Sequence, residues 1–277
     1  MSHSPLTVAA IQLSSQDDVA GNLAQCRQWL ERAAQAGAKL AVLPENFAFF
    51  GPDAARVKLA EPLLAAGTEA APIQRALAGW ARELGITIVG GGMPTQSGDA
   101  ARPFNTAVVF GPDGRLLGHY HKVHLFDVSL SSGEQLRESS HTARGESLAT
   151  LGVAGFEVGL SICYDVRFPE LYRGLVDRGA EVILVPAAFT LHTGKDHWAP
   201  LLQARAIESQ AWVVAAGQWG SHPGGRRCHG HSMVVDPWGA IIAQCPDRQG
   251  FALATLDHEY QQQVRASVPS LQHRRLR

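Results

Sequence analysis

Continuous apolar runs alternate with stretches of helical periodicity along the first half of the chain. The runs at residues 7–13, 39–43 and 86–90 are typical of buried β-strands, and the apolar spacing at 22–36 and 72–84 predicts amphipathic helices. Strand patterns at 105–110 and 115–120 flank the turn sequence Gly-Pro-Asp-Gly. The first half therefore predicts alternating strand and helix closed by a hairpin.

The second half repeats this order. Strand patterns at 156–163, 181–185 and 212–216 alternate with helical patterns at 169–177 and 198–210, and strand patterns at 232–235 and 240–243 form a final hairpin. Residues 37–47 and 179–189 match in residue type, and this register places Glu45 opposite Ala187. Sheets that are apolar on both faces need cover on both faces. We expect an α/β fold, a four-layer αββα sandwich with a pseudo-twofold internal repeat, formed as a single domain over residues 1–277.

Composition and charge narrow the class of protein. The chain has 277 residues, of which 45% are hydrophobic, enough for a sizeable core. Its 24 Lys plus Arg nearly balance its 25 Asp plus Glu, so neither nucleic acid nor a membrane surface is the expected partner. No stretch reaches the roughly 18 apolar residues of a membrane helix, and the N-terminus lacks a signal-peptide pattern. Four scattered cysteines favour a reducing compartment, so we expect a cytoplasmic protein.

Three reactive side chains follow strand patterns at comparable places. Glu45 follows the second strand pattern, Lys122 follows the first hairpin, and Cys163 ends the first strand pattern of the second half. Pro169 and Glu170 mark a helix start just beyond Cys163. Each reactive residue also has a plain structural interpretation, as a solvated carboxylate, a surface amine or a buried thiol. An unpaired carboxylate among the apolar neighbours of Glu45 would be costly, and Lys122 is its natural partner.

The segments LPENF at 43–47, HKVHLFD at 121–127 and CYDVRFPE at 163–170 resemble the three signature motifs of the nitrilase superfamily, the carbon-nitrogen hydrolases. All three occur in the family's order, and the likeness covers nearly the whole chain. The resemblance implies a catalytic triad of Glu45, Lys122 and Cys163.

The resemblance also implies roles for these residues in hydrolysis of an amide. Glu45 takes the proton of Cys163 and later passes one to departing ammonia, while Cys163 forms a thioester. Lys122 and the backbone N–H of Tyr164 stabilise the oxyanion. The family has a second glutamate, which corresponds to Glu138 in this sequence, with nearby Glu134 as the alternative. We expect no cofactor.

The segments 204–208, 230–239 and 272–275 resemble a branch of small amidases that hydrolyse deaminated glutathione, whose relatives are ω-amidases acting on α-ketoglutaramate. This favours a small carboxylate-bearing amide, deaminated glutathione first and α-ketoglutaramate as the alternative, cleaved to acid and ammonia. The non-enzyme alternative is an inactive scaffold or partner-binding member, although all three triad residues are present. The resemblance further implies a homodimer or higher homo-oligomer, built on the helices after the strands that end near Cys163 and Phe189.

A carboxylate-bearing substrate needs cations or backbone donors. Arg167 is the best-placed arginine because it lies four residues beyond Cys163, although an ion pair with Glu170 is equally compatible with its position. Phe189 and Thr190 follow the strand opposite Glu45 in the repeat, and with Tyr164 they complete the substrate-binding candidates.

Two clusters could instead be considered as metal ligands, because imidazole and thiolate suit zinc. They are His119, His121 and His124, and Cys228, His229 and His231. Neither has the spacing of a closed metal site, so we expect no metal.

Overall fold

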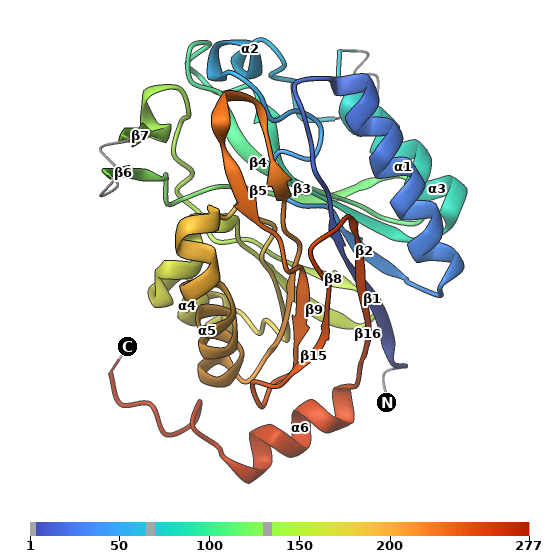
Figure 1. The fold of residues 1–277 in the computed structure, drawn as a ribbon. Coiled ribbons are helices and arrows are strands. Elements are labelled where there is room, and N and C mark those ends of the chain that lie inside the picture. The colour runs from blue at the N-terminus through green and yellow to red at the C-terminus, as the bar shows by residue number, and fades with distance from the viewer. Residues whose placement is uncertain (1–3, 65–69, 130–134, 277) are drawn as a thin grey trace.

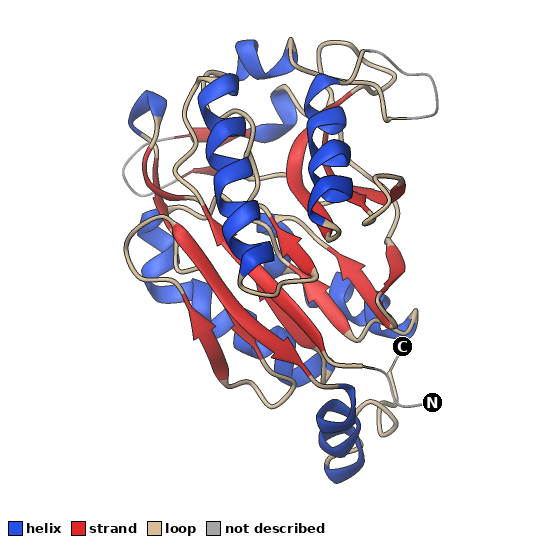
Figure 2. Ribbon diagram, turned by 90° about the vertical axis from the view of Figure 1, so that its right-hand side faces the viewer, coloured by secondary structure: helices blue, strands red, loops and turns tan. Residues whose placement is uncertain are grey.

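The computed structural model describes residues 4–64, 70–129 and 135–276. It contains two six-stranded sheets with helices on their outer faces (Figures 1 and 2). The strands of the first sheet are β1 (Leu6–Gln12), β2 (Leu40–Val42), β3 (Thr87–Thr95), β4 (Phe104–Phe110), β5 (Leu116–His121) and β16 (Gly250–Leu256). Those of the second are β8 (Thr150–Val153), β9 (Phe156–Leu160), β10 (Val182–Leu184), β11 (Trp212–Ala215), β14 (Met233–Val235) and β15 (Ile241–Gln244). This is the predicted αββα sandwich.

The helices and two small hairpins complete the description. The helices are α1 (Val19–Gln35), α2 (Asp53–Val57), α3 (Pro72–Leu84), α4 (Pro169–Asp177), α5 (Leu191–Ser209) and α6 (His258–Ser267). The small hairpins pair β6 (Asp127–Ser129) with β7 (Gln135–Arg137), and β12 (Trp219–Ser221) with β13 (Arg227–His229). No helix in the described part of the chain is both long enough and apolar enough to cross a membrane.

The internal repeat is visible in the order of the strands. The first sheet runs β16-β1-β2-β3-β4-β5, and the second, taken in the same sense, runs β8-β9-β10-β11-β14-β15. In both sheets one antiparallel edge strand is followed by three parallel strands and then two antiparallel ones. Helices α1 and α3 connect the parallel strands of the first sheet, as α4 and α5 do in the second. The two halves therefore present equivalent strand ends at equivalent positions.

Strand β1 shows why the apolar runs are continuous. Val8 and Ala10 belong to the core that includes the second sheet, whereas Ala9 and Ile11 pack with residues of α1 and α3. Both faces of the strand are buried, so the positions from Val8 to Ile11 are all apolar. Burial of each large aliphatic side chain contributes about 1.5–3 kcal/mol, which holds the four layers together.

Most predicted elements are confirmed, with shifts at their ends. Helix α4 begins at Pro169 as predicted, while α1 begins at Val19 because the Asp18 side chain caps it by accepting from Ala20 N–H. Helix α5 begins at Leu191, seven residues before the predicted start, because its polar first two turns carry no apolar periodicity. Strand β9 ends at Leu160, so Cys163 lies in the turn beyond the strand instead of at its last position.

Candidate active site

Cys163 lies in a tight turn between β9 and α4. It opens a short 3₁₀ segment, Cys163–Arg167, with a φ of 51°, an uncommon conformation for a residue other than glycine. Its N–H donates to the carbonyl of Pro186, 2.9 Å away, which ties the turn to the end of β10. Strained backbone of this kind persists only where surrounding structure holds it, and such positions are frequent in active sites.

Asp165 holds this turn in place. Its side chain is fully buried and accepts hydrogen bonds from the N–H of Ile162 (2.9 Å) and the hydroxyl of Tyr120 (2.8 Å). The backbone N–H and the ring of His124 contact its other oxygen at 3.0 and 2.7 Å. Asp165 had no predicted role from the sequence, although a carboxylate in a buried turn requires such partners.

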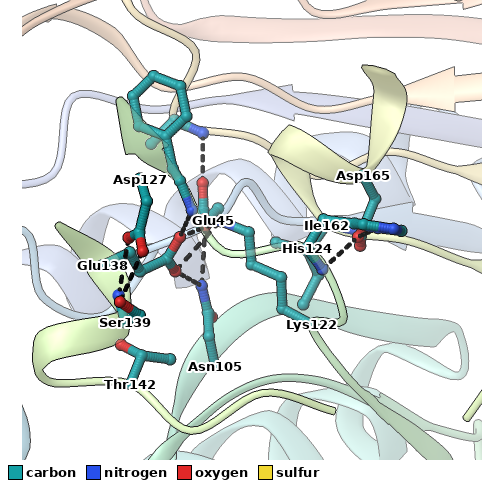
Figure 3. Close-up of polar contacts among 12 residues, drawn as sticks. Glu45, Asn105, Lys122, His124, Asp127, Glu138, Ser139, Thr142, Ile162 and Asp165 are labelled. Carbon is teal, nitrogen blue, oxygen red and sulfur yellow. Dashed lines mark hydrogen bonds and ion pairs between the residues drawn. The ribbon is translucent and has the colours of Figure 1, made fainter. Parts of the chain in front are cut away.

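Glu45 and Lys122 form a buried ion pair next to this turn. The Lys122 ammonium lies 2.9 Å from Glu45 Oε1 and 2.9 Å from Glu138 Oε2 (Figure 3). Glu45 is 4% exposed and Lys122 is 2% exposed. Asn105, which the sequence analysis did not single out, donates to Glu45 Oε1 at 2.8 Å. The prediction that Lys122 is the partner of Glu45 is confirmed.

Glu138 reaches this pair from the segment that follows β7. Its Oε2 also accepts from the backbone N–H of Phe126 at 2.7 Å, and its Oε1 lies 3.4 Å from Asn105 Nδ2. The alternative residue, Glu134, lies outside the described residues. Asn105 had a weak signal in the sequence, because it is a polar side chain at the start of an otherwise apolar strand pattern.

The end of β10 supplies a backbone donor to the same cluster. Glu45 Oε2 accepts from the N–H of Ala188 at 2.9 Å, and the Glu45 carboxylate lies close enough to Cys163 to raise the pKa of its thiol. Side chains from the first half of the chain therefore contact the cysteine of the second half.

Burial and charge set the protonation states of the cluster. Burial alone would raise the pKa of Glu45, but the Lys122 ammonium and hydrogen bonds from Lys122, Cys163 and Ala188 outweigh it and lower that pKa. Burial and the nearby Glu45 carboxylate raise the pKa of the Cys163 thiol well above its ordinary value. Burial disfavours the charge of Lys122, yet Glu138 and Glu45 raise its pKa well above normal. The site therefore holds a carboxylate and an ammonium beside a neutral thiol.

A cavity of about 540 Å³ opens onto this cluster, a size suited to a small-molecule ligand. Its lining includes all the residues that the sequence singled out as catalytic or substrate-binding: Glu45, Lys122, Glu138, Cys163, Tyr164, Arg167, Phe189 and Thr190. The structure thus brings the predicted site residues together around one cavity.

Arg167 lies against an aromatic ring in this cavity. Its guanidinium carbon is 5.2 Å from the centroid of the Phe189 ring, and its terminal nitrogens lie 3.4 Å from His197 Nδ1. Over the described residues, Arg167 forms no ion pair with Glu170 or any other carboxylate. Its charge is available to a ligand.

The histidines considered as metal ligands have protein partners. His121 Nδ1 lies 2.8 Å from the Thr106 hydroxyl, and His231 Nε2 lies 2.8 Å from Asp247. In the segments that the structure describes, no group of three or more His, Cys, Asp or Glu side chains is placed to hold a metal ion.

Two packed sheets with internal pseudo-symmetry, and a buried carboxylate, ammonium and thiol where their strand ends meet, define a protein of the nitrilase fold. The chain belongs to the carbon-nitrogen hydrolase family, because the family model described as "Carbon-nitrogen hydrolase" matches residues 7–266.

Individual relatives agree with this assignment. The deaminated glutathione amidase of Synechocystis sp. is 42% identical over 273 residues, covering 98% of this chain and 98% of that protein. The deaminated glutathione amidase of Homo sapiens is 39% identical, covering 97% of this chain and 82% of that protein.

Solved structures show the same fold. The Caenorhabditis elegans NitFhit protein superposes with a TM-score of 0.90 at 38% identity, and this chain is covered to 99% but spans only 66% of that longer protein. Saccharomyces cerevisiae Nit3, a member of branch 10 of the nitrilase superfamily, gives a TM-score of 0.86 at 31% identity, with 96% of this chain and 94% of that chain covered.

Proposed function

We propose that this protein is an amidase that hydrolyses deaminated glutathione through a thioester on Cys163. The observation that carries the proposal is the buried ion pair of Glu45 and Lys122, which lines the same cavity as Cys163. The similarity to amidases named for this substrate supports the choice of acyl group.

Glu45 is the proposed general base. Its lowered pKa keeps it ionised, and the raised pKa of Cys163 keeps the thiol protonated until the attack. As the Cys163 sulfur bonds to the amide carbon, its proton moves to the nearby Glu45 carboxylate. A thiolate never has to exist alone in the buried site.

Lys122 and the backbone N–H of Tyr164 are the proposed donors to the oxyanion. A single such donor contributes roughly 3–4 kcal/mol to transition-state stabilisation in other enzymes. Lys122 keeps its charge throughout because Glu138 remains its partner at 2.9 Å when Glu45 is protonated. Glu138 is therefore proposed to position Lys122, and full turnover in Glu138→Gln would remove it from the mechanism.

The leaving group follows from the substrate. In deaminated glutathione the nitrogen of the cleaved amide belongs to a cysteinylglycine dipeptide, so the amine that departs is that dipeptide; the ammonia predicted from the sequence applies to α-ketoglutaramate. Protonated Glu45 gives its proton to the departing amine as the tetrahedral adduct collapses to the thioester. Glu45 then takes a proton from water, which attacks the thioester, releases the 2-oxo dicarboxylic acid and restores the thiol.

Arg167 is the proposed binding group for the carboxylate of the acyl portion. It lies four residues beyond Cys163, lines the cavity and has no carboxylate partner in the described segments. Phe189 supports its guanidinium by a cation–π contact, and a planar guanidinium can bind a carboxylate through two parallel hydrogen bonds.

We also propose a homodimer that uses α4 and α5, and a cytoplasmic location. Ile207 of α5 is 53% exposed, and Trp238 in the turn between β14 and β15 is 58% exposed, so both offer apolar surface to a partner. All four cysteines, Cys26, Cys163, Cys228 and Cys245, are free thiols, which suits a reducing compartment. Sedimentation of the protein with and without Ile207→Glu tests the dimer.

The function is tested by incubating the protein and Cys163→Ala with deaminated glutathione and with α-ketoglutaramate. Release of cysteinylglycine and of ammonia is measured separately. Preference for deaminated glutathione, abolished in Cys163→Ala, is the expected result. Preference for α-ketoglutaramate would keep the mechanism and overturn the substrate, whereas no release from either would overturn the proposal.

A further inference from the structure

Helix α2 places a buried arginine in the wall of the active-site cavity. Arg56 is only 7% exposed and lines the cavity. One terminal nitrogen, Nη1, donates to the hydroxyl of Thr142 at 3.2 Å, while Nη2 is buried without any hydrogen-bond partner. A buried guanidinium with an unpaired nitrogen costs free energy unless an anion completes its contacts.

The carboxylates that line the cavity are already engaged elsewhere. Glu45 and Glu138 share Lys122. Asp53, three residues before Arg56 on α2, is 3.3 Å from His141 Nε2 and 3.3 Å from Arg226 Nη2. Over the described residues no carboxylate pairs with Arg56, and this leaves its charge for an anion bound in the cavity.

We propose that Arg56 binds the terminal carboxylate of the dipeptide leaving group. This inference rests on the proposed function, because deaminated glutathione carries one carboxylate on each side of the cleaved amide. Arg167 follows Cys163 closely in the second half of the chain, whereas Arg56 reaches the cavity from α2 in the first half. Two separate arginines therefore match two separate carboxylates, and Arg56 selects a peptide amide over an unsubstituted one.

The kinetic test compares Arg56→Gln with the unaltered protein on both substrates. We expect kcat/KM for deaminated glutathione to fall roughly 10- to 100-fold, because a hydrogen bond to a charged group contributes about 1.5–3 kcal/mol. The value for α-ketoglutaramate, which lacks the dipeptide, should change by less than about twofold. Arg227→Gln is the matched control, since it removes an exposed cation from the same cavity lining.

Each alternative result contradicts a defined part of the inference. Equal losses on both substrates would mean that Arg56 serves the acyl portion or the fold. An equal loss in Arg227→Gln would replace a specific subsite by the general charge of the cavity. No loss on deaminated glutathione, with the unaltered protein active, would overturn the Arg56 proposal alone. Inactivity of the unaltered protein on deaminated glutathione would overturn the proposed function, and this inference with it.

A second measurement has a main arm that uses only the unaltered protein. Deaminated glutathione whose glycine carboxylate is converted to the amide should be cleaved by the unaltered protein with the same 10- to 100-fold lower kcat/KM, a difference of about 1.4–2.8 kcal/mol. Arg56→Gln should cleave the two forms equally well. An unaltered protein that does not distinguish acid from amide would contradict the proposal.

Discussion

The ends of β2 and β10 occupy equivalent places in the internal repeat but contribute different chemistry. After β2 the chain continues through Pro44 to Glu45, whose side chain enters the cavity. After β10 it continues through Pro186 to Ala187 and Ala188, and there the group that reaches the site is the Ala188 backbone N–H. The hydrogen bond between that N–H and Glu45 joins the two ends. The repeat thus provides a symmetric frame, and the difference between Glu45 and Ala187 contributes to the asymmetry of the site.

The two strand ends also differ in how their polar groups are satisfied. At Ala187 the backbone N–H donates to Ala216 and the carbonyl accepts from Gln218, so the backbone pairs within the second sheet's own segment. At Glu45 the carboxylate needs Lys122, Asn105 and Ala188 from three other segments. The polar groups of Ala187 therefore find hydrogen-bond partners within the second sheet, whereas the Glu45 carboxylate depends on groups that only the assembled fold brings together.

The largest effect is expected from removing the carboxylate of Glu45, which follows β2. We predict that Glu45→Gln lowers kcat roughly 10²- to 10⁴-fold, because the proposed general base is replaced by a group that cannot accept the thiol proton. Lys122 keeps Glu138 as its partner, so the variant should still fold at neutral pH. Steady-state kinetics and circular dichroism check both points; near-normal kcat would mean that another group activates Cys163.

The second largest effect is expected from removing the Lys122 ammonium, which pairs with Glu45 after β2. Lys122→Met leaves Glu45 and Glu138 as buried carboxylates without their cation, and we predict a loss of roughly 3–5 kcal/mol in the free energy of unfolding. Urea denaturation measures it. Adding Glu45→Gln and Glu138→Gln to Lys122→Met should restore part of the loss; an unchanged stability in Lys122→Met would contradict the pairing.

A smaller effect is expected when the Ala188 N–H, which follows β10, no longer donates to Glu45. Replacing the Ala188 N–H by an ester oxygen removes one hydrogen bond to a charged carboxylate, worth about 1.5–3 kcal/mol. The pKa of Glu45 should rise, so the acid limb of the kcat/KM profile should move to higher pH. An ester at Ala187 breaks its bond to Ala216 instead and should leave that limb in place. Identical profiles for both esters would mean that Ala188 does not act on Glu45.

The smallest effect concerns acid stability. The pKa of Glu45 in the folded protein lies below its ordinary value of 4.5, so its ionisation stabilises the fold above pH 4.5 and this contribution is lost as the pH falls through the folded pKa. In Glu45→Gln the unfolding free energy should therefore fall less steeply below pH 4.5. Urea titrations across that range measure the difference, and parallel curves for the two proteins would contradict the lowered pKa.

Much of the fold follows from the pattern of the sequence. The parallel strands, α1, α3, α4 and both sheet hairpins were predicted because buried strands and amphipathic helices have clear periodicity. The strands β8 and β16 and the small hairpins were not predicted, because they are short or partly exposed and carry little pattern. Helix α5 was predicted with too late a start because its first turns are polar, and its length became clear only from the structure.

The site divides in the same way. Glu45, Lys122, Cys163 and Glu138 were singled out because chemistry and motif order marked them. Asp165 lies within the third motif, but its role could not be predicted. The groups that donate hydrogen bonds to its carboxylate come partly from Tyr120 and His124, which are distant in the sequence. Arg56 had no signal, because nothing local distinguishes a buried arginine on a short helix from a solvated one.

The sequence by itself determined the two-half architecture, the family and the candidate catalytic residues, because periodicity and motif order are local properties of the chain. Only the tertiary structure decided the charge states of those residues and which further groups hold them. Burial and ion pairing depend on atoms brought together from distant segments, as when Ala188, Lys122 and Asn105 converge on Glu45. Local sequence patterns indicate which residues are candidates for the site, and tertiary packing sets their protonation states.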